Sequence, residues 1–207
     1  MNLAWSPTKV LITGTSGSGK TLYWTKYLLG SRARWKFVFD HDGQLSARLR
    51  CRPARQPDEV AHYASRGFCL YDPSQMWPGR LSDGFDWFCQ FVFEACKHVR
   101  GSKLFACDEL QSFVPSRGWP EPFAAILQTG RVHEIDTAFI SVAPNAVHPE
   151  IRNQATEVVA FSTVASGAVD FLQTEWGFDG EELRQLPQFR FIARRKAGGT
   201  VRGRVKL

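Results

Sequence analysis

The amino-acid sequence predicts an α/β fold with a mainly parallel, doubly wound sheet and a C-terminal β-hairpin. Short apolar runs that are typical of strands alternate with segments of helical periodicity along most of the 207 residues. The first of these runs leads into a glycine-rich turn, and two others end in acidic residues. Because parallel strands place their carboxyl ends at one edge of a sheet, we expect a ligand to bind at this edge.

The expected elements follow from apolar spacing and from turn residues. Strands are expected at residues 9–13, 35–40, 68–71, 103–107, 137–142, 158–161, 189–193 and 200–205. Helices are expected at 20–29, 85–99, 121–132, 169–176 and 180–185, with a short helical turn at 148–154. Asp83 is the expected N-cap of the helix at 85–99, and Gly30 can end the first helix. Residues 50–57, rich in Arg and Pro, are expected to form an exposed loop.

Residues 14–21 read Gly-Thr-Ser-Gly-Ser-Gly-Lys-Thr, a complete G-x-x-x-x-G-K-[ST] phosphate loop after an apolar strand. Its glycines let several backbone amides converge on one anion, and the helix that comes next points free N–H groups at phosphate. We therefore predict a site for ATP with Mg²⁺, in which Lys20 reaches the β- and γ-phosphates and the Thr21 hydroxyl binds the metal. The alternative is a glycine-rich turn that matches by chance. The predicted nucleotide-binding residues are Gly14, Thr15, Ser16, Gly17, Ser18, Gly19, Lys20, Thr21 and Leu22.

A second motif of the same kind of site lies at residues 103–109, a short apolar strand that ends in two carboxylates. Asp108 fits the Walker B acid that holds Mg²⁺ through water, and Glu109 fits the base that polarises an attacking water. At least two strands separate the phosphate loop from Asp108, which favours the RecA-like (ASCE) class of P-loop NTPases over small-molecule kinases. Adjacent acids at a strand end are common, so this motif alone is a moderate indication of a nucleotide site. Together with the phosphate loop it is a strong one.

Length and composition predict one domain, residues 1–207, without a membrane span. The segment Met1–Pro7 lacks the basic start and apolar centre of a signal peptide, and the five cysteines contain no C-x-x-C pair. We therefore expect a soluble protein of the cytoplasm.

The net charge of +6 comes from the C-terminus, because seven of the 26 Lys and Arg residues and none of the 20 Asp and Glu residues lie in the last 18 positions. A basic hairpin at 188–207 suggests contact with a polyanion, nucleic acid first. The alternative is a solvated edge of the sheet, where cations discourage aggregation. The candidate DNA contacts are Arg194, Arg195, Lys196, Arg202 and Arg204.

Several segments beyond the Walker motifs resemble the FtsK and HerA superfamily of DNA-pumping ATPases. Phe-Val-Phe-Asp-His-Asp-Gly at 37–43 is similar to the family's second strand, and Thr-Gly-Arg-Val-His at 129–133 is similar to its G-R-x-x-G segment. Pro144 and the stretches 151–154 and 158–161 are similar to the region after that segment in the family. The short chain looks most like the genome-packaging ATPases of tailless icosahedral viruses with internal membranes. The resemblance implies a ring-forming homo-oligomer that drives double-stranded DNA into a preformed capsid, with a capsid or membrane-vertex protein as a further partner.

The resemblance also implies roles for single residues. Arg131 is similar to the arginine of the G-R segment and is the candidate arginine finger or sensor, with Arg117 and Arg152 as rivals; the alternative is an ordinary contact with a helix end. The family places a polar sensor at the end of the strand after Walker B, where this chain has Val142, so Ser141 or Asn145 is the candidate substitute. The segment 112–118 could line a central channel.

Other functions are compatible with the same motifs. The chain also resembles the zonula occludens toxin-like assembly ATPases of filamentous phages, which normally carry a membrane-spanning segment. A switch that binds ATP but hydrolyses it negligibly is a second alternative, against which the Glu109 carboxylate argues. A small phosphotransferase is a third, although no lid rich in paired arginines is evident.

Overall fold

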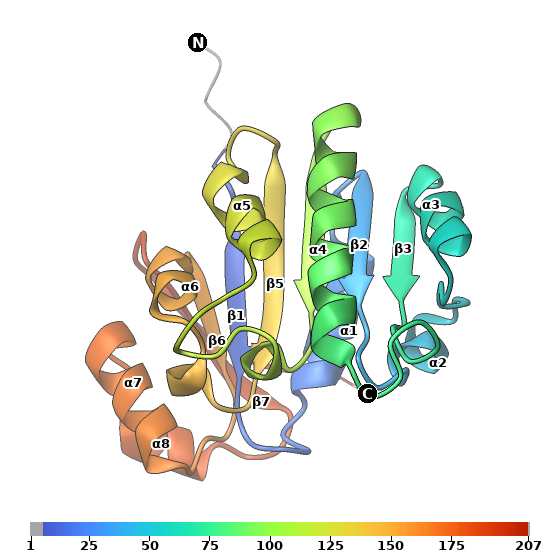
Figure 1. The fold of residues 1–207 in the computed structure, drawn as a ribbon. Coiled ribbons are helices and arrows are strands. Elements are labelled where there is room, and N and C mark those ends of the chain that lie inside the picture. Colours follow the sequence, from blue (N-terminus) through green and yellow to red (C-terminus); the bar gives the residue numbers. More distant parts are fainter. Residues whose placement is uncertain (1–5, 207) are drawn as a thin grey trace. The chain divides into compact units, whose positions relative to one another are not determined.

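The computed structural model describes residues 6–206 and shows the predicted α/β fold (Figure 1). Most of the segment Met1–Pro7, where we expected no signal peptide, lies outside this described part, as does Leu207 at the end of the predicted hairpin. Eight strands are hydrogen-bonded in the order β3-β2-β4-β5-β1-β6-β7-β8. Strand β2 runs parallel to β3 and β4, and β1 runs parallel to β6, whereas β6, β7 and β8 are antiparallel neighbours. The prediction of a mainly parallel sheet with a C-terminal hairpin is confirmed.

The strands lie close to the positions that the apolar runs predict. They are β1 (Lys9–Thr13), β2 (Trp35–Phe39), β3 (Phe68–Tyr71), β4 (Lys103–Cys107), β5 (Ile135–Ser141), β6 (Glu157–Ala160), β7 (Arg190–Arg195) and β8 (Thr200–Arg204). The α-helices are α1 (Lys20–Gly30), α2 (Leu45–Leu49), α3 (Pro57–Ser65), α4 (Leu81–His98), α5 (Glu121–Thr129), α6 (Pro149–Gln154), α7 (Ser166–Trp176) and α8 (Gly180–Gln185). Two short 3₁₀ helices are η1 (Leu110–Ser112) and η2 (Pro144–Ala146). Among residues 6–206, no helix combines the length and apolar character needed to cross a membrane.

Three expectations for helices were wrong. Helix α4 begins at Leu81, so Asp83 lies in its first turn and Arg80 takes the N-cap position. The helix continues through Gly84, where a Cβ would lie 2.8 Å from Pro73 Cβ, so a glycine is needed for this close packing. Helix α5 ends at Thr129, because a turn in which Val132 N–H donates to Thr129 O replaces the expected last turn.

The segment between β2 and β3 is more ordered than the predicted exposed loop. It contains α2 and α3, both missed in the sequence. Between them, Ala54 is fully buried and pairs with Tyr71 in an isolated parallel bridge. Alanine contributes little apolar surface, and the flanking Arg and Pro residues hide this buried position from a hydropathy pattern.

The chain divides into two compact units, and the single domain that we expected stays a prediction. The first unit contains residues 6–7, 29–108 and 119–137 of the described part of the chain. Its core is aromatic: the Phe39 and Phe85 ring centroids lie 5.1 Å apart, Phe85 and Phe123 5.5 Å apart, and Tyr71 stacks on Phe88 at 4.9 Å. Each such ring buries about 150–250 Å², which stabilises the fold by several kcal/mol at about 25 cal/mol per Å². Helix α4 lies across β2, and α3 packs on β3 (Figure 1).

The second unit contains residues 8–28, 109–118 and 138–207. Strands β1 and β6 are its buried centre, with Leu11 paired to Val158 and Ile12 to Val159. Trp24 of α1 is fully buried, and its indole N–H donates to Ala138 O at 3.0 Å. The unit therefore holds the phosphate loop on a rigid base of strand and helix.

Candidate nucleotide site

The phosphate loop connects β1 to α1, and its glycines adopt backbone angles that other residues avoid. The φ angles of Gly14, Gly17 and Gly19 are +145°, +73° and +114°. A Cβ on Gly14 would lie 2.7 Å from Phe161 Cβ, and one on Gly19 would lie 2.9 Å from Phe189 Cδ1. A Cβ on Gly17 would meet nothing within 4 Å. Packing and φ thus both demand glycine at Gly14 and Gly19, whereas φ alone favours it at Gly17.

Two polar side chains of the loop are buried in a way that suits an anion. Lys20, only 6% exposed, donates from Nζ to the Thr15 carbonyl at 2.7 Å. Ser18 is also buried, and its Oγ has no hydrogen-bond partner among the described residues. A buried orphan hydroxyl is costly, and a phosphate oxygen would satisfy it. The residues present therefore fit the phosphates of a nucleotide.

The loop is held by two segments that the sequence motif does not reveal. Thr15 N–H donates to Ser162 O at 2.7 Å, and the Thr15 hydroxyl donates to the same oxygen at 3.0 Å. From the segment before β7, Phe189 N–H donates to Ser18 O at 2.9 Å and Gln188 Nε2 donates to Gly17 O at 3.0 Å. Phe189 has a φ of +64°, which is strained for a bulky residue. Sequence reasoning missed these contacts because they join residues 147 to 171 positions apart, and no local pattern encodes them.

The acids of the second motif follow β4 directly, as predicted. All five residues of β4 are buried, whereas Asp108 and Glu109 are partly exposed. Glu109 lies in the left-handed region with φ 49° and ψ 45°, immediately before η1. Such strain in a residue other than glycine is uncommon and concentrates at functional sites. The roles of Asp108, Glu109, Thr21 and Leu22 in the site stay predictions.

Three aspartates stand in register at the carboxyl ends of neighbouring strands in the first unit. Phe39 of β2 is paired with Tyr71 of β3 and with Cys107 of β4. The next residue of each strand is an aspartate: Asp40, Asp72 and Asp108. The register places the predicted Walker B acid in a row with two further carboxyls. Sequence reasoning noted Asp40 only as the end of a strand, since the pairing of β2 with β3 is not visible in the sequence.

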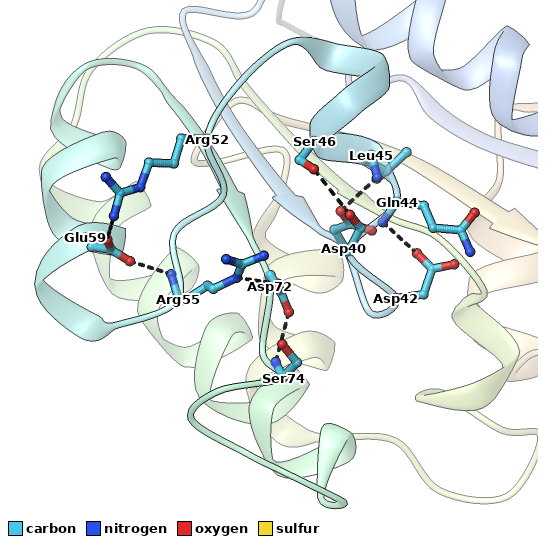
Figure 2. Close-up of polar contacts among 11 residues, drawn as sticks. Asp40, Asp42, Gln44, Leu45, Ser46, Arg52, Arg55, Glu59, Asp72 and Ser74 are labelled. Atoms are coloured by element: carbon cyan, nitrogen blue, oxygen red, sulfur yellow. Dashed lines mark hydrogen bonds and ion pairs between the residues drawn. The ribbon is translucent and has the colours of Figure 1, made fainter.

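Two of these carboxyls are bound very differently (Figure 2). Asp40 is fully buried and its Oδ2 accepts from Leu45 N–H at 3.0 Å. The Asp40 pKa is raised to about 7, chiefly by burial. The Leu45 hydrogen bond lowers this pKa, whereas the nearby Asp42 and Asp72 carboxyls raise it. Asp72 instead accepts from Arg55 Nε at 2.7 Å and from Ser74 N–H at 3.0 Å. Burial alone would raise the Asp72 pKa, but these bonds outweigh it and hold the pKa below its ordinary value.

The candidate sensor residues have contacts of their own. Ser141 is the last residue of β5, is buried, and accepts from Ala143 N–H through Oγ at 3.2 Å. Asn145 lies in η2, where its Nδ2 would be 2.9 Å from a Cβ on Gly167 of α7. Ser141 therefore lies at the strand end that the family resemblance indicates, and Asn145 lies against the start of α7.

The three candidate arginine fingers differ in their freedom. Arg131 is exposed in the turn after α5, and Arg117 is exposed in the segment 112–118. Arg152 instead pairs with Glu175 at 3.2 Å and lies over the Phe171 ring at 5.3 Å. These contacts tie Arg152 down, so Arg131 and Arg117 are better placed to act on a neighbouring molecule. In the segment 112–118, Phe113 and Val114 are buried, whereas Ser112 and the residues from 115 to 118 are exposed.

Four of the five candidate DNA contacts in the hairpin are engaged within the protein. Arg195 pairs with Glu157 at 2.8 Å, and Arg202 makes two hydrogen bonds with Glu182 at 2.7 and 2.9 Å. Arg194 donates to Trp176 O at 3.2 Å, and Lys196 Nζ donates to Asn153 O. Arg204, the fifth, has no ion pair or side-chain hydrogen bond within residues 6–206. Sequence composition could not separate these groups, because their partners come from distant helices and strands.

Solved structures of viral ATPases have the same fold. The genome-packaging NTPase B204 from Sulfolobus turreted icosahedral virus 2, in complex with ATPγS, matches with a TM-score of 0.76 at 14% identity, over 97% of this chain and 98% of that chain. The DNA-packaging ATPase B204 from Sulfolobus turreted icosahedral virus matches with a TM-score of 0.68 at 17% identity, over 97% and 99% of the two chains.

A further solved ATPase structure shares the fold as well. EssC (ATPases 2 and 3) from Geobacillus thermodenitrificans matches with a TM-score of 0.64 at 12% identity, over 94% of this chain and 39% of that chain. No protein-family model matches the chain, and no curated protein matches its sequence. At these identities the likeness establishes the fold alone, which is the fold of these ATPases and the one that the sequence predicted.

Proposed function

We propose that this protein is an ATP-hydrolysing DNA translocase that packages double-stranded viral DNA into a preformed capsid. The observation that carries the proposal is a complete phosphate loop in a fold whose match to a genome-packaging NTPase covers 97% of this chain. The orphan Ser18 hydroxyl and the inward Lys20 ammonium support a phosphate ligand in the loop. The basic hairpin supports a polyanionic partner.

In this function the Lys20 ammonium exchanges the Thr15 carbonyl for the β- and γ-phosphates of ATP. Thr21 and Asp108 would hold Mg²⁺, which when bound neutralises charge on the phosphate oxygens. Glu109 orients and polarises the attacking water. Ser141 or Asn145 senses the γ-phosphate.

Translocation requires several copies in a ring, so that one copy acts on the nucleotide of the next. Arg131, exposed in its turn, is the proposed arginine finger across this boundary, where such groups contribute about 10³–10⁵ in rate. Loss of the γ-phosphate would then shift the segments 110–118 and 129–134 that contact DNA or the neighbouring copy. A capsid or membrane-vertex protein would anchor the motor, which places the protein in the host cytoplasm or on the virion.

The ATPase rate with and without long duplex DNA tests this function. We expect DNA to stimulate wild-type hydrolysis, and Glu109→Gln to lower the rate at least about 100-fold while ATP affinity stays within a few-fold, since a general base contributes about 10²–10⁴. Glu121→Gln, at an exposed glutamate in the first turn of α5, is the matched control and should behave as wild type. Nucleotide binding without hydrolysis, or hydrolysis that DNA leaves unchanged at several salt concentrations, would contradict the proposal.

A further inference from the structure

An open groove of about 430 Å³ lies between α1 and the C-terminal hairpin, within the second unit. Every side chain that lines it is aromatic, aliphatic or cationic. The lining residues are Tyr23, Lys26, Tyr27, Phe191, Arg204, Val205 and Lys206. A volume of this size lies in the range of small-ligand sites and is enough for about one nucleotide residue of a longer strand.

The groove has a rigid floor. Tyr23, Lys26 and Tyr27 are three and four positions apart on α1, so they share one face of the helix. The rings of Tyr23 and Phe191 meet edge to face with centroids 4.9 Å apart. Phe191 lies over Gly203 of β8, where a Cβ would come within 2.5 Å of the ring. The aromatic wall therefore depends on a glycine in the neighbouring strand.

The cations of the groove differ from the other basic groups of the hairpin. Arg204 is exposed and has no ion pair within the described residues, whereas Arg195 and Arg202 pair with glutamates. Lys26 donates to the backbone carbonyl of Lys206, a bond that draws two chain segments together without neutralising either ammonium. Three positive charges thus converge on one groove, and the described residues that line it include no carboxylate side chain.

We propose that this groove binds the sugar–phosphate backbone of nucleic acid, which under the function proposed above is the packaged double-stranded DNA. Phosphate contacts in protein–DNA complexes come from Arg, Lys and Tyr side chains, and these are the polar groups of the groove. The aromatic and Val205 surfaces pack against the sugars. Phosphates follow one another closely along a strand, so one strand can engage Lys26, Arg204 and Lys206 together. The inference rests on the proposed function and moves the contact surface from the paired arginines to the α1 side of the hairpin.

Binding of fluorescein-labelled duplex DNA, followed by fluorescence anisotropy across a series of salt concentrations, tests the groove. The variant Lys26→Ala/Arg204→Ala/Lys206→Ala should lose at least tenfold in affinity, and its slope of log K against log salt should fall by about 0.9 for each phosphate that the variant no longer neutralises. The matched control, Arg48→Ala/Arg66→Ala/Arg184→Ala, removes the same charge from exposed positions elsewhere and should lose far less. Arg204→Lys, which keeps the charge, should retain most of the wild-type slope. Circular dichroism and ATP affinity verify that each variant is folded.

The outcomes separate this inference from the function on which it rests. Equal DNA binding by the groove variant and the control variant, with wild-type ATPase still stimulated by DNA, would overturn the groove and leave the translocase intact. A wild-type protein that binds no duplex at all would overturn both. A groove variant that binds DNA normally but changes oligomeric state in light scattering would show that the groove contacts a second copy of the chain. A groove variant that loses affinity only for ATP would show that the groove binds the nucleotide. Either result would contradict the inference.

Discussion

The end of β1 and the ends of β2 and β3 are both carboxyl ends of parallel strands, yet they carry opposite chemistry. After β1, glycines and the buried Lys20 form a loop that suits an anion. After β2 and β3, Asp40 and Asp72 form an acidic pair that is contacted by backbone amides and Arg55 (Figure 2). A position at the ligand edge of a sheet therefore does not make an anion site. The residues that follow each strand decide which ligand can approach.

The largest expected effect comes from a substitution in the phosphate loop, the region after β1 that suits an anion. Gly14→Ala should abolish measurable ATP binding, because its Cβ would lie 2.7 Å from Phe161 Cβ and the φ of +145° is unfavourable for alanine. Gly17→Ala is the matched control, since its Cβ meets nothing within 4 Å and only the left-handed strain of about 1–2 kcal/mol remains. Isothermal titration with ATPγS measures both. Equal losses of ATPγS affinity in the two variants would show that packing against Phe161 does not determine the conformation of the loop.

The second largest effect concerns the buried Asp40 carboxyl after β2 and the pH dependence of the protein's stability. A carboxyl with a folded pKa of about 7 and an unfolded value near 3.8 binds more protons in the folded state between these values. Stability therefore falls as pH rises from about 4 through about 7, by about 1.4 kcal/mol for each tenfold difference in proton affinity between the folded and unfolded states. Asp40→Asn keeps an acceptor for Leu45 N–H and cannot ionise, so it should flatten this fall and be the more stable protein above pH 7.

Urea unfolding at a series of pH values measures the Asp40 effect. Asp170→Asn, at an exposed position of α7, is the control and should keep the wild-type pH profile. Parallel pH profiles for wild type and Asp40→Asn would contradict a raised pKa of the buried carboxyl.

The smallest expected effect sharpens the account of what holds the phosphate loop. Gln188→Ala removes the bond to Gly17 O and should weaken ATP binding two- to tenfold, in line with about 0.5–1.5 kcal/mol for one hydrogen bond. The thermal midpoint should change little, because Gln188 is exposed. Gln185→Ala removes a comparable exposed bond, to Glu181, and should leave ATP affinity unchanged. A shift in the thermal midpoint without a change in ATP affinity would assign Gln188 to general stability.

The two strand ends also show how far the sequence can predict this protein. The phosphate loop was predictable because its geometry depends on glycines and a lysine within eight consecutive residues. The row of Asp40, Asp72 and Asp108 was not, because it depends on the register of strands whose paired residues lie 32 positions apart for β2 and β3 and 68 for β2 and β4. For the same reason the sequence counted the hairpin cations correctly but could not tell Arg202, paired with Glu182 of α8, from Arg204. Short helices such as α2 were not predicted, because five residues are too few to show a helical periodicity of apolar positions.

The left-handed backbone of Glu109 has a consequence for how this protein would respond to selection. Glycine tolerates this conformation without penalty, so Glu109→Gly would remove a local strain while deleting the carboxylate that we propose as the base. A laboratory screen that rewards only resistance to heat would therefore tend to enrich inactive clones at this codon. Thermal robustness and turnover have to be screened together if this protein is to be engineered.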